Sequence, residues 1–263
     1  MPTIPIAVEW QNVSKTFYKD GNPVQATHNI SLQIEEGEFV SIIGPSGCGK
    51  STLLNMTAGI MQPTSGRVLY RGQEVKGVNT RVGYITQKDN LLPWRTVRAN
   101  VALALEIRRV PKAEQDRLIA EYIERVGLSG FENHYPRELS GGMRKRVALI
   151  RTLIYDPETL LMDEPFGALD AQLKTIMQDE LLRIWSGSGK TVIFVTHDLH
   201  EAIVLSDRVV VLCRRPGTIK LVERVPLPRP RNVFDLSFNA ETNELHRRLW
   251  EALREDMRMG EAV

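Results

Sequence analysis

The sequence predicts an α/β fold built around a mostly parallel sheet. A short apolar segment at residues 39–43 leads into a glycine-rich run and then into a helical pattern, in the order strand, loop, helix. From residue 160 onward, compact apolar runs alternate with helical patterns, as is typical of strands that helices cover on both faces. Residues 97–154 have a helical pattern, so we expect a helical block inserted between the two halves of the core.

The N-terminal part of the chain favours β-structure. Apolar and polar side chains alternate in short segments, and turn residues such as Asp20-Gly21 and Glu36-Gly37 separate these segments. The helix after the glycine-rich run should end at Gly59. We expect an antiparallel β subdomain whose strands include residues 7–10, 30–34 and 67–70.

The helical insert, placed at about residues 91–155, carries one clear apolar stripe. The stripe recurs at helical spacing between Pro111, near the start of a helix, and Gly127, a typical C-terminal stop. Its members are Leu118, Ile119, Tyr122, Ile123 and Val126. We therefore expect at least one amphipathic helix here.

The second half of the chain should complete the core and end in a helical tail. Buried strands are expected at residues 160–162, 191–195 and 208–212. Apolar side chains on the helix between the first two are Leu173, Ile176, Met177, Leu181 and Ile184. A last amphipathic helix is predicted from Leu245, Leu249, Trp250 and Leu253. The proline-rich, basic stretch at 226–231 divides a domain over residues 1–231 from a tail over 232–263.

Composition argues against several classes of function. Thirty-four Lys and Arg residues nearly balance 32 Asp and Glu residues, and a net charge of +2 does not indicate a nucleic-acid partner. Cys48 and Cys213 suggest neither a disulfide nor a metal site, which fits a reducing, cytosolic location. We expect no secretory signal and no membrane span, because no window approaches 18 consecutive apolar residues.

The glycine-rich run has the sequence of a P-loop in the right structural context. It comprises Gly44, Pro45, Ser46, Gly47, Cys48, Gly49, Lys50 and Ser51, and Thr52 continues it into the helix. Its glycines let backbone N–H groups turn toward an anion at a helix N-terminus. Lys50 can reach the β- and γ-phosphates of a nucleotide, and the Ser51 hydroxyl can coordinate Mg²⁺.

A second motif indicates hydrolysis of that nucleotide. Asp163 ends a buried strand and can hold Mg²⁺ through its water shell, and the next residue, Glu164, can act as a general base for the attacking water. By itself, such an acidic pair would more often cap a strand. Its combination with a P-loop favours the catalytic interpretation.

A third motif, Ser140-Gly141-Gly142, opens another helix and forms a second anion-binding helix N-terminus. One nucleotide cannot obviously occupy both this N-terminus and the P-loop of the same chain. A head-to-tail dimer would solve this, because each nucleotide would lie between the P-loop of one chain and the Ser-Gly-Gly of the other. As a plain helix cap the motif would mean little.

With these motifs the sequence resembles the ATP-binding subunits of ABC transporters, from about residue 7 to about residue 231. The resemblance implies that Gln87 is the Q-loop glutamine that contacts Mg²⁺, that His197 is the switch histidine, and that Asp170 belongs to the D-loop at the dimer interface. It also implies that Phe17, or Tyr18 in its place, stacks on adenine. ATP and Mg²⁺ follow as ligands, with Ser51, Gln87 and Asp163 as metal ligands.

The resemblance further implies partners and a location. It implies a second ATP-binding subunit, two transmembrane permease subunits and, indirectly, an extracytoplasmic solute-binding protein, at the cytoplasmic face of a bacterial inner membrane. Residues 91–94 should border the groove that receives the permease. Together with Arg215-Pro216-Gly217 and 227–231, they resemble the importer branch for nitrate, sulfonates and taurine.

The chain departs from the family pattern in ways that remove no catalytic group. Lys145 stands where Gln is usual, and less usual residues also stand at Ile150, Thr152 and Thr159. The alternatives are an export ATPase, a soluble ABC ATPase and, more weakly, a P-loop kinase. The chain has one ATP-binding half, a short insertion and a Ser-Gly-Gly motif, which argue respectively against translation factors, DNA-repair proteins and kinases.

Overall fold

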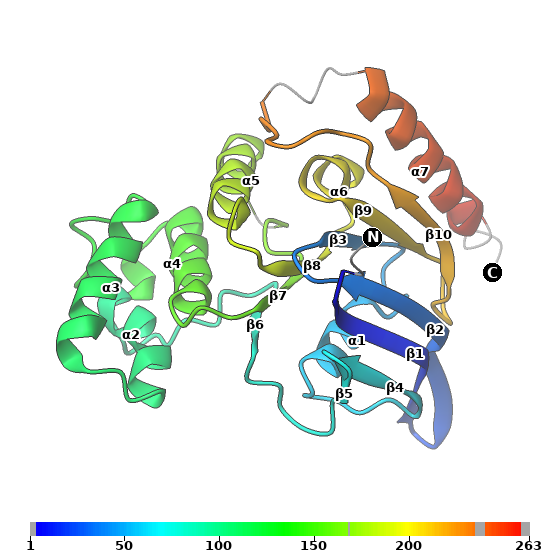
Figure 1. Ribbon diagram of the computed structural model, residues 1–263, viewed down its shortest axis with the longest axis horizontal. Helices are drawn as coiled ribbons and strands as arrows, with labels where there is room; N and C mark the ends of the chain where they lie inside the picture. Colours follow the sequence, from blue (N-terminus) through cyan, green and yellow to red (C-terminus); the bar gives the residue numbers. More distant parts are fainter. Residues whose placement is uncertain (1–3, 168, 235–239, 259–263) are drawn as a thin grey trace.

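The computed structural model describes residues 4–167, 169–234 and 240–258, which form an α/β core, an antiparallel sheet and a helical block at one end (Figure 1). The core sheet has the strand order β10-β9-β3-β8-β7-β6, and only β10 runs antiparallel to its neighbour. Its strands are β3 (Phe39–Ile43), β6 (Val82–Ile85), β7 (Thr159–Asp163), β8 (Thr191–Val195), β9 (Arg208–Leu212) and β10 (Ile219–Arg224). The predicted mostly parallel sheet is confirmed.

The register of the core sheet gathers its loops at one edge. Asp163, the last residue of β7, pairs with Val195, the last residue of β8, and Val195 also pairs with Ile42 of β3. Because these strands are parallel, the segments that follow them leave the sheet side by side, which is where α/β proteins place their ligands.

The second sheet is antiparallel, in the order β2-β1-β4-β5. Its strands are β1 (Ile6–Lys19), β2 (Asn22–Glu35), β4 (Ser65–Tyr70) and β5 (Gln73–Glu74). The strands predicted at 7–10 and 30–34 are therefore pieces of one long hairpin. Register shifts along the hairpin, together with left-handed backbone at Asn12 and Asn29, interrupt the alternation of side chains, so the pattern revealed only fragments.

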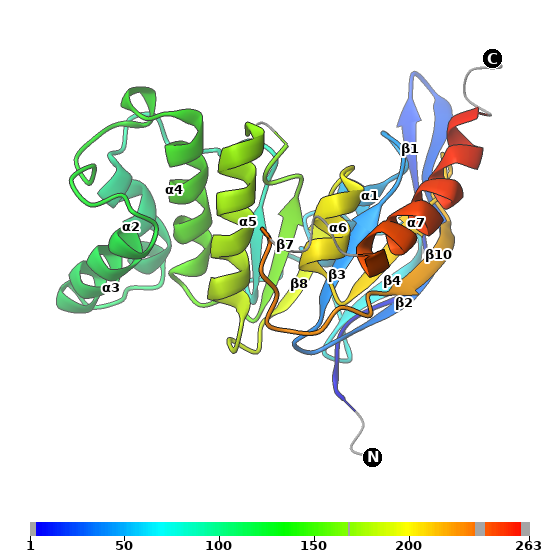
Figure 2. The ribbon, with the colours of Figure 1, turned by 90° about the horizontal axis from the view of Figure 1, so that it is seen from above.

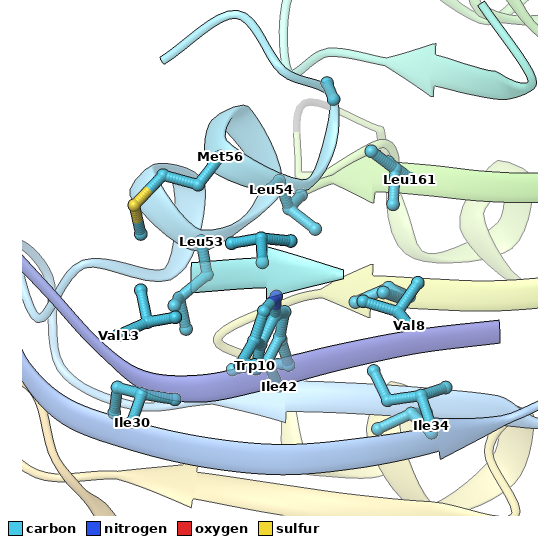
Figure 3. Packing of buried hydrophobic residues seen from close by; sticks show 14 of the residues in the cluster. Val8, Trp10, Val13, Ile30, Ile34, Ile42, Leu53, Leu54, Met56 and Leu161 are labelled. Carbon is cyan, nitrogen blue, oxygen red and sulfur yellow. The ribbon is translucent and has the colours of Figure 1, made fainter. Parts of the chain in front are cut away.

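The core between the two sheets is built around α1 (Lys50–Thr57), as Figure 3 shows. Trp10 of β1 and Ile42 of β3 are fully buried in this core together with Leu53 of α1. The Trp10 Nε1–H donates to Thr57 Oγ1 at 3.0 Å. Burial of side chains of this size contributes about 1.5–3 kcal/mol each, so the helix that follows the glycine-rich loop is firmly held. The predicted stop is confirmed, because Gly59 follows the helix with a positive φ of 71°.

The helical insert lies beyond β6 at one end of the molecule (green in Figure 1) and has its own core. It contains α2 (Val97–Ile107), α3 (Lys112–Arg125), a 3₁₀ helix (Pro136–Glu138) and α4 (Gly141–Leu153). Ile119, Ile123 and Val126 of the predicted stripe are buried, and Leu118 and Tyr122 pack at the edge of the same cluster. The prediction of an amphipathic helix here is confirmed.

Three further helices lie over the face of the core sheet opposite α1 (Figure 2). They are α5 (Ala171–Trp185), α6 (Leu199–Leu205) and α7 (Ala240–Arg258). Two apolar side chains on the predicted helices, Ile176 and Trp250, are exposed, because each lies about 100° around its helix from the buried row that contacts the core. No helix in the described part of the chain is both long and apolar enough to cross a membrane.

Candidate active site

The P-loop is held by close backbone packing between β3 and α1. Gly49, the residue before α1, has a φ of 96°, and a Cβ there would lie 2.4 Å from Thr27 Cγ2. Only glycine combines this left-handed conformation with this approach. The Lys50 side chain is 7% exposed, and its ammonium group donates to the carbonyls of Gly44 at 2.8 Å and Pro45 at 3.0 Å. The loop therefore positions a cation at its own centre.

Two of the three predicted metal ligands, Ser51 and Asp163, are in direct contact. Ser51, in the first turn of α1, donates from its hydroxyl to Asp163 Oδ1 at 3.0 Å. Burial raises the pKa of Asp163, and the Ser51 hydrogen bond opposes this change only in part. A carboxylate that is costly to ionise here would be stabilised by a cation beside it.

Glu164 lies at the centre of a cluster from three loops. Its Oε2 accepts a hydrogen bond from Gln87 Nε2 at 3.2 Å, and His197 Nδ1 lies 3.3 Å from the same oxygen. Gln87 follows β6, Glu164 follows β7 and His197 follows β8, so the parallel register described above brings all three together. The structure thus unites the four residues predicted to be catalytic: Gln87, Asp163, Glu164 and His197.

Gln87, Asp163 and Glu164 border a cavity of about 400 Å³, whereas His197 does not line it. One part of its wall is apolar and comes from the hairpin, where Phe17, Val24 and Ala26 line it. The P-loop and the acidic cluster line the rest with Ser46, Gly47, Gly49, Lys50, Ser51, Thr52, Gln87, Asp163 and Glu164. The final lining residue, Arg215, was not among the predicted site residues. Its only sequence signal was the Arg-Pro-Gly turn.

The Ser-Gly-Gly motif lies outside this cavity. Ser140 is the N-cap of α4, and its hydroxyl accepts a hydrogen bond from the Met143 N–H at 3.3 Å. Ser140 and Gly141 are exposed, whereas Gly142 packs so closely on Leu173 that a Cβ would lie 2.1 Å from it. Within one chain, the second anion-binding helix N-terminus is therefore separate from the P-loop.

Asp170, the predicted D-loop residue, caps a helix as well. Its carboxylate accepts a hydrogen bond from the Leu173 N–H at 3.0 Å at the N-terminus of α5, and it does not line the cavity. Ala168, in the middle of the predicted D-loop, lies outside the described residues.

Basic side chains of α4 hold the segment that follows Gln87. Lys145 donates to the Gln87 carbonyl, and Arg144 Nε donates to Asp89 Oδ2 at 3.1 Å. Arg151 donates to the carbonyls of Asp89 at 2.9 Å and Asn90 at 2.7 Å. Burial lowers the pKa of Lys145, and Asp89 partly opposes the shift. Lys145, to which the sequence assigned no role, thus ties α4 to the backbone of Gln87, the predicted Q-loop residue.

A groove of about 430 Å³ lies beside this tie, and its position corrects one expectation. It is lined by Gln87, Lys88, Asp89, Asn90, Gly141, Arg144, Lys145 and Leu169. Leu91, expected at its border, is instead buried in the core of the insert. Its side chain packs with residues of α2, such as Val97 and Val101, in that core. Trp94 is 71% exposed and does not line the groove.

Comparison with known proteins agrees with this geometry. A family model described as "ABC transporter" matches residues 27–167. An uncharacterized ABC transporter ATP-binding protein of Methanocaldococcus jannaschii is 51% identical over 89% of this chain and 87% of its own length. The aliphatic sulfonates import ATP-binding protein SsuB of Bacillus anthracis is 45% identical, with 89% of this chain and 92% of that protein covered. The taurine import ATP-binding protein TauB of Roseobacter denitrificans is 43% identical, over 82% and 81%.

Solved structures match as well. A dimeric ATP-binding cassette in a post-hydrolysis state, bound to ADP and Pi, superposes with a TM-score of 0.76 at 33% identity. The match covers 84% of this chain and all of that one.

Proposed function

This chain belongs to the ABC transporter family of ATP-binding subunits, and from that premise we propose that it powers solute import through a separate membrane permease. The chain is an ATPase, and its fold is that of an ATP-binding cassette. The solute would be a small organic or inorganic anion, such as nitrate, a sulfonate or a taurine-like compound. Relatives named as sulfonate and taurine import proteins support this solute class.

The carboxylate of Glu164 is the observation that carries the catalytic part of the proposal. It lies in the P-loop cavity and is held by Gln87 and His197, so it can be aimed at a water that attacks the γ-phosphate. As general base, Glu164 would take the proton from that water. Gln87 and His197 would orient the carboxylate, and Lys50 with the loop N–H groups would bind the phosphates.

The donors around Ser51 fit magnesium. They are a hydroxyl, a carboxylate and an amide oxygen, from Ser51, Asp163 and Gln87, and Mg²⁺ prefers oxygen ligands from few protein groups together with substrate phosphates. The raised pKa of Asp163, which results from its burial, is consistent with a carboxylate placed to face a cation. When bound, the ion would neutralise phosphate charge.

The partners follow from the separation of the two anion-binding helix ends. Ser140, Gly141 and Gly142 lie outside the cavity, so a second ATP-binding subunit would supply them to complete each site. A cassette solved as a dimer supports this arrangement. We propose that the dimer docks on two permease subunits at the cytoplasmic face of the membrane and that an extracytoplasmic protein delivers the solute. ATP would favour the closed dimer, and hydrolysis would reopen it.

Removal of the proposed base tests the catalytic assignment. Glu164→Gln should bind ATP normally, accumulate an ATP-bound dimer and lose about 10²- to 10⁴-fold in turnover, the usual contribution of a general base. Glu74→Gln, at an exposed glutamate outside the cavity, is the matched control and should hydrolyse ATP normally. Full steady-state hydrolysis by Glu164→Gln would refute the role of Glu164.

Transport is tested in cells that lack the encoding gene. Uptake of labelled nitrate, taurine and ethanesulfonate should fall for at least one of these solutes. The wild-type gene should restore the uptake, and the Glu164→Gln gene should not. Unchanged uptake of all three would overturn the proposed solute class.

A further inference from the structure

The nucleotide cavity contains a second cation besides Lys50. Arg215, in the turn between β9 and β10, lines the cavity beside Ser46 and Gly47. Its Nε–H donates to the Gly47 carbonyl at 3.3 Å, and its Nη2 atom lies 3.2 Å from where a Cβ of Gly47 would be. The guanidinium group is therefore placed against the phosphate-binding loop itself.

The turn that carries Arg215 is fixed on this loop by its backbone. The Gly217 N–H donates to the Ala26 carbonyl at 2.9 Å, and the His28 N–H donates to the Gly217 carbonyl at 2.9 Å. A Cβ on Gly217 would lie only 1.9 Å from the Cys48 carbonyl oxygen. This contact leaves room for glycine only, so Arg215 extends from a turn whose position relative to the P-loop is set.

The charge of Arg215 has no acidic partner in the part of the chain that the structure describes. Its Nε–H donates to the neutral carbonyl of Gly47, while a guanidinium group has five N–H donors. The two acids of the cavity have other partners: Asp163 accepts from Ser51, and Glu164 contacts Gln87 and His197. An exposed cation with free donors at an anion-binding loop is suited to a phosphate.

We propose that Arg215 is a nucleotide ligand that donates hydrogen bonds to the phosphate chain of ATP. This inference rests on the proposed role of the cavity as the ATP site. The phosphates are favoured over the adenine because Gly47, to which Arg215 is bonded, belongs to the phosphate loop, whereas the apolar wall around Phe17 comes from the hairpin.

Nucleotide affinities of the full chain test the proposal. Dissociation constants for ATP, ADP and AMP would be measured by competition with a fluorescent ATP analogue. Arg215→Ala should weaken ATP binding about tenfold at 0.1 M salt, as for loss of a hydrogen bond to a charged group. The loss should be smaller for AMP, and it should shrink at 1 M salt because the group is exposed. Arg215→Lys should recover part of the affinity.

Two control variants separate the possible results. Arg214→Ala removes a neighbouring exposed arginine that does not line the cavity, and ATP binding should stay within twofold of normal. Lys50→Ala tests the site itself. If Lys50→Ala binds ATP normally, the proposed function fails. If Lys50→Ala is weakened and Arg215→Ala is not, only the role of Arg215 is overturned. Equal losses for AMP and ATP with Arg215→Ala would also overturn a phosphate contact.

Discussion

The identity of the site residues could be predicted from the sequence, but their contacts could not. Asp163 and Glu164 could be identified because an acidic pair ends a buried strand. Their partners depend on how three strands are aligned, which sequence spacing does not reveal. The backbone of Glu164 has a φ of 45°, unusual for a residue other than glycine, and such strain typically costs about 1–3 kcal/mol. The surrounding structure holds this conformation and thereby aims the carboxylate.

The buried carboxylate of Asp163 should make the protein without nucleotide less stable. Because burial raises its pKa in the folded state, the folded protein binds this proton more readily than the unfolded chain does. The resulting cost is absent at a pH below the ordinary carboxylate pKa and is fully present above the raised folded-state value. We therefore expect Asp163→Asn to have the higher melting temperature at neutral pH.

Thermal unfolding as a function of pH checks this sign. The advantage of Asp163→Asn should shrink as the pH falls toward the ordinary carboxylate range. Asp20→Asn, at an exposed aspartate, serves as the control for the removal of a surface charge. A variant less stable than the wild type at neutral pH would contradict the prediction.

At the scale of elements, local pattern predicted helices better than it predicted the hairpin or the loop after Gln87. The stripe on α3 keeps a regular helical spacing, whereas bulges interrupt the alternation in β1 and β2. Leu91 was misplaced because a short apolar segment does not show whether it is covered by a partner or by its own domain. The partners of the basic residues of α4 could not be read from the sequence, since Lys145 and Arg151 donate to backbone carbonyls about 60 residues earlier and Arg144 donates to the Asp89 carboxylate.

The tie formed by Lys145 should restrain the Q-loop. Lys145→Met keeps most of the aliphatic stem but removes the donor to the Gln87 carbonyl. Hydrogen exchange of residues 86–91 should rise about fivefold, equivalent to ~1 kcal/mol for one hydrogen bond, while the melting temperature stays within about 2 °C. Lys112→Met, on the exposed start of α3, should leave this exchange unchanged. Unchanged exchange in Lys145→Met would show that Arg144 and Arg151 suffice.

The exposed indole of Trp94 should serve an interface rather than the core. Large apolar side chains at this exposure are natural anchors for a partner. Trp94→Ala should keep the ATPase rate of the isolated subunit within about threefold and weaken assembly with the permease, or uncouple hydrolysis from uptake. Trp250→Ala, at an exposed tryptophan on α7, is the control and should assemble normally. Unfolding of Trp94→Ala would mean that the side chain is structural.

At the scale of the whole molecule, the chain contains two separate parts of the proposed ATP sites, the P-loop and the helix N-terminus at Ser140. The P-loop lies in the α/β core and Ser140 begins the last helix of the insert, so this geometry is what a head-to-tail dimer requires. The motifs predicted this separation because both are helix N-termini that attract anions. A helical tail is predicted over residues 232–263, and α7 lies in this range. Its side chains Leu245, Leu249 and Leu253 pack onto the core. Whether the tail is a separate domain stays a prediction.

Complementation between two inactive variants tests the dimer. Ser140→Arg should leave ATP binding of the monomer intact but abolish ATP-driven dimerisation, because arginine adds bulk and positive charge at the N-terminus of α4. Ser140→Ala controls for the lost cap, which costs about 1 kcal/mol of helix stability. Mixed with Lys50→Ala chains, Ser140→Arg should restore one intact site per heterodimer.

The readouts are ATPase activity and size-exclusion chromatography of the mixture. A mixture with neither dimer nor activity would contradict the arrangement, unless both sites are required. A crosslink between cysteines placed at Ser46 of one chain and Ser140 of the other would separate these two explanations.

The hydrogen bond from Lys145 of α4 to the Gln87 carbonyl connects the helical insert to two ATP sites of the proposed dimer. A displacement of α4 would shift the backbone of Gln87, whose side chain contacts Glu164 in the cavity of the same chain. The N-terminus of the same helix would present Ser140 to the nucleotide bound by the opposite chain. If ATP binding changes the orientation of the insert, then a permease that moves the insert must change the affinity for ATP by the same coupling free energy. In the proposed dimer the two ATP turnovers would therefore be correlated in time, each one resetting the conditions for the next.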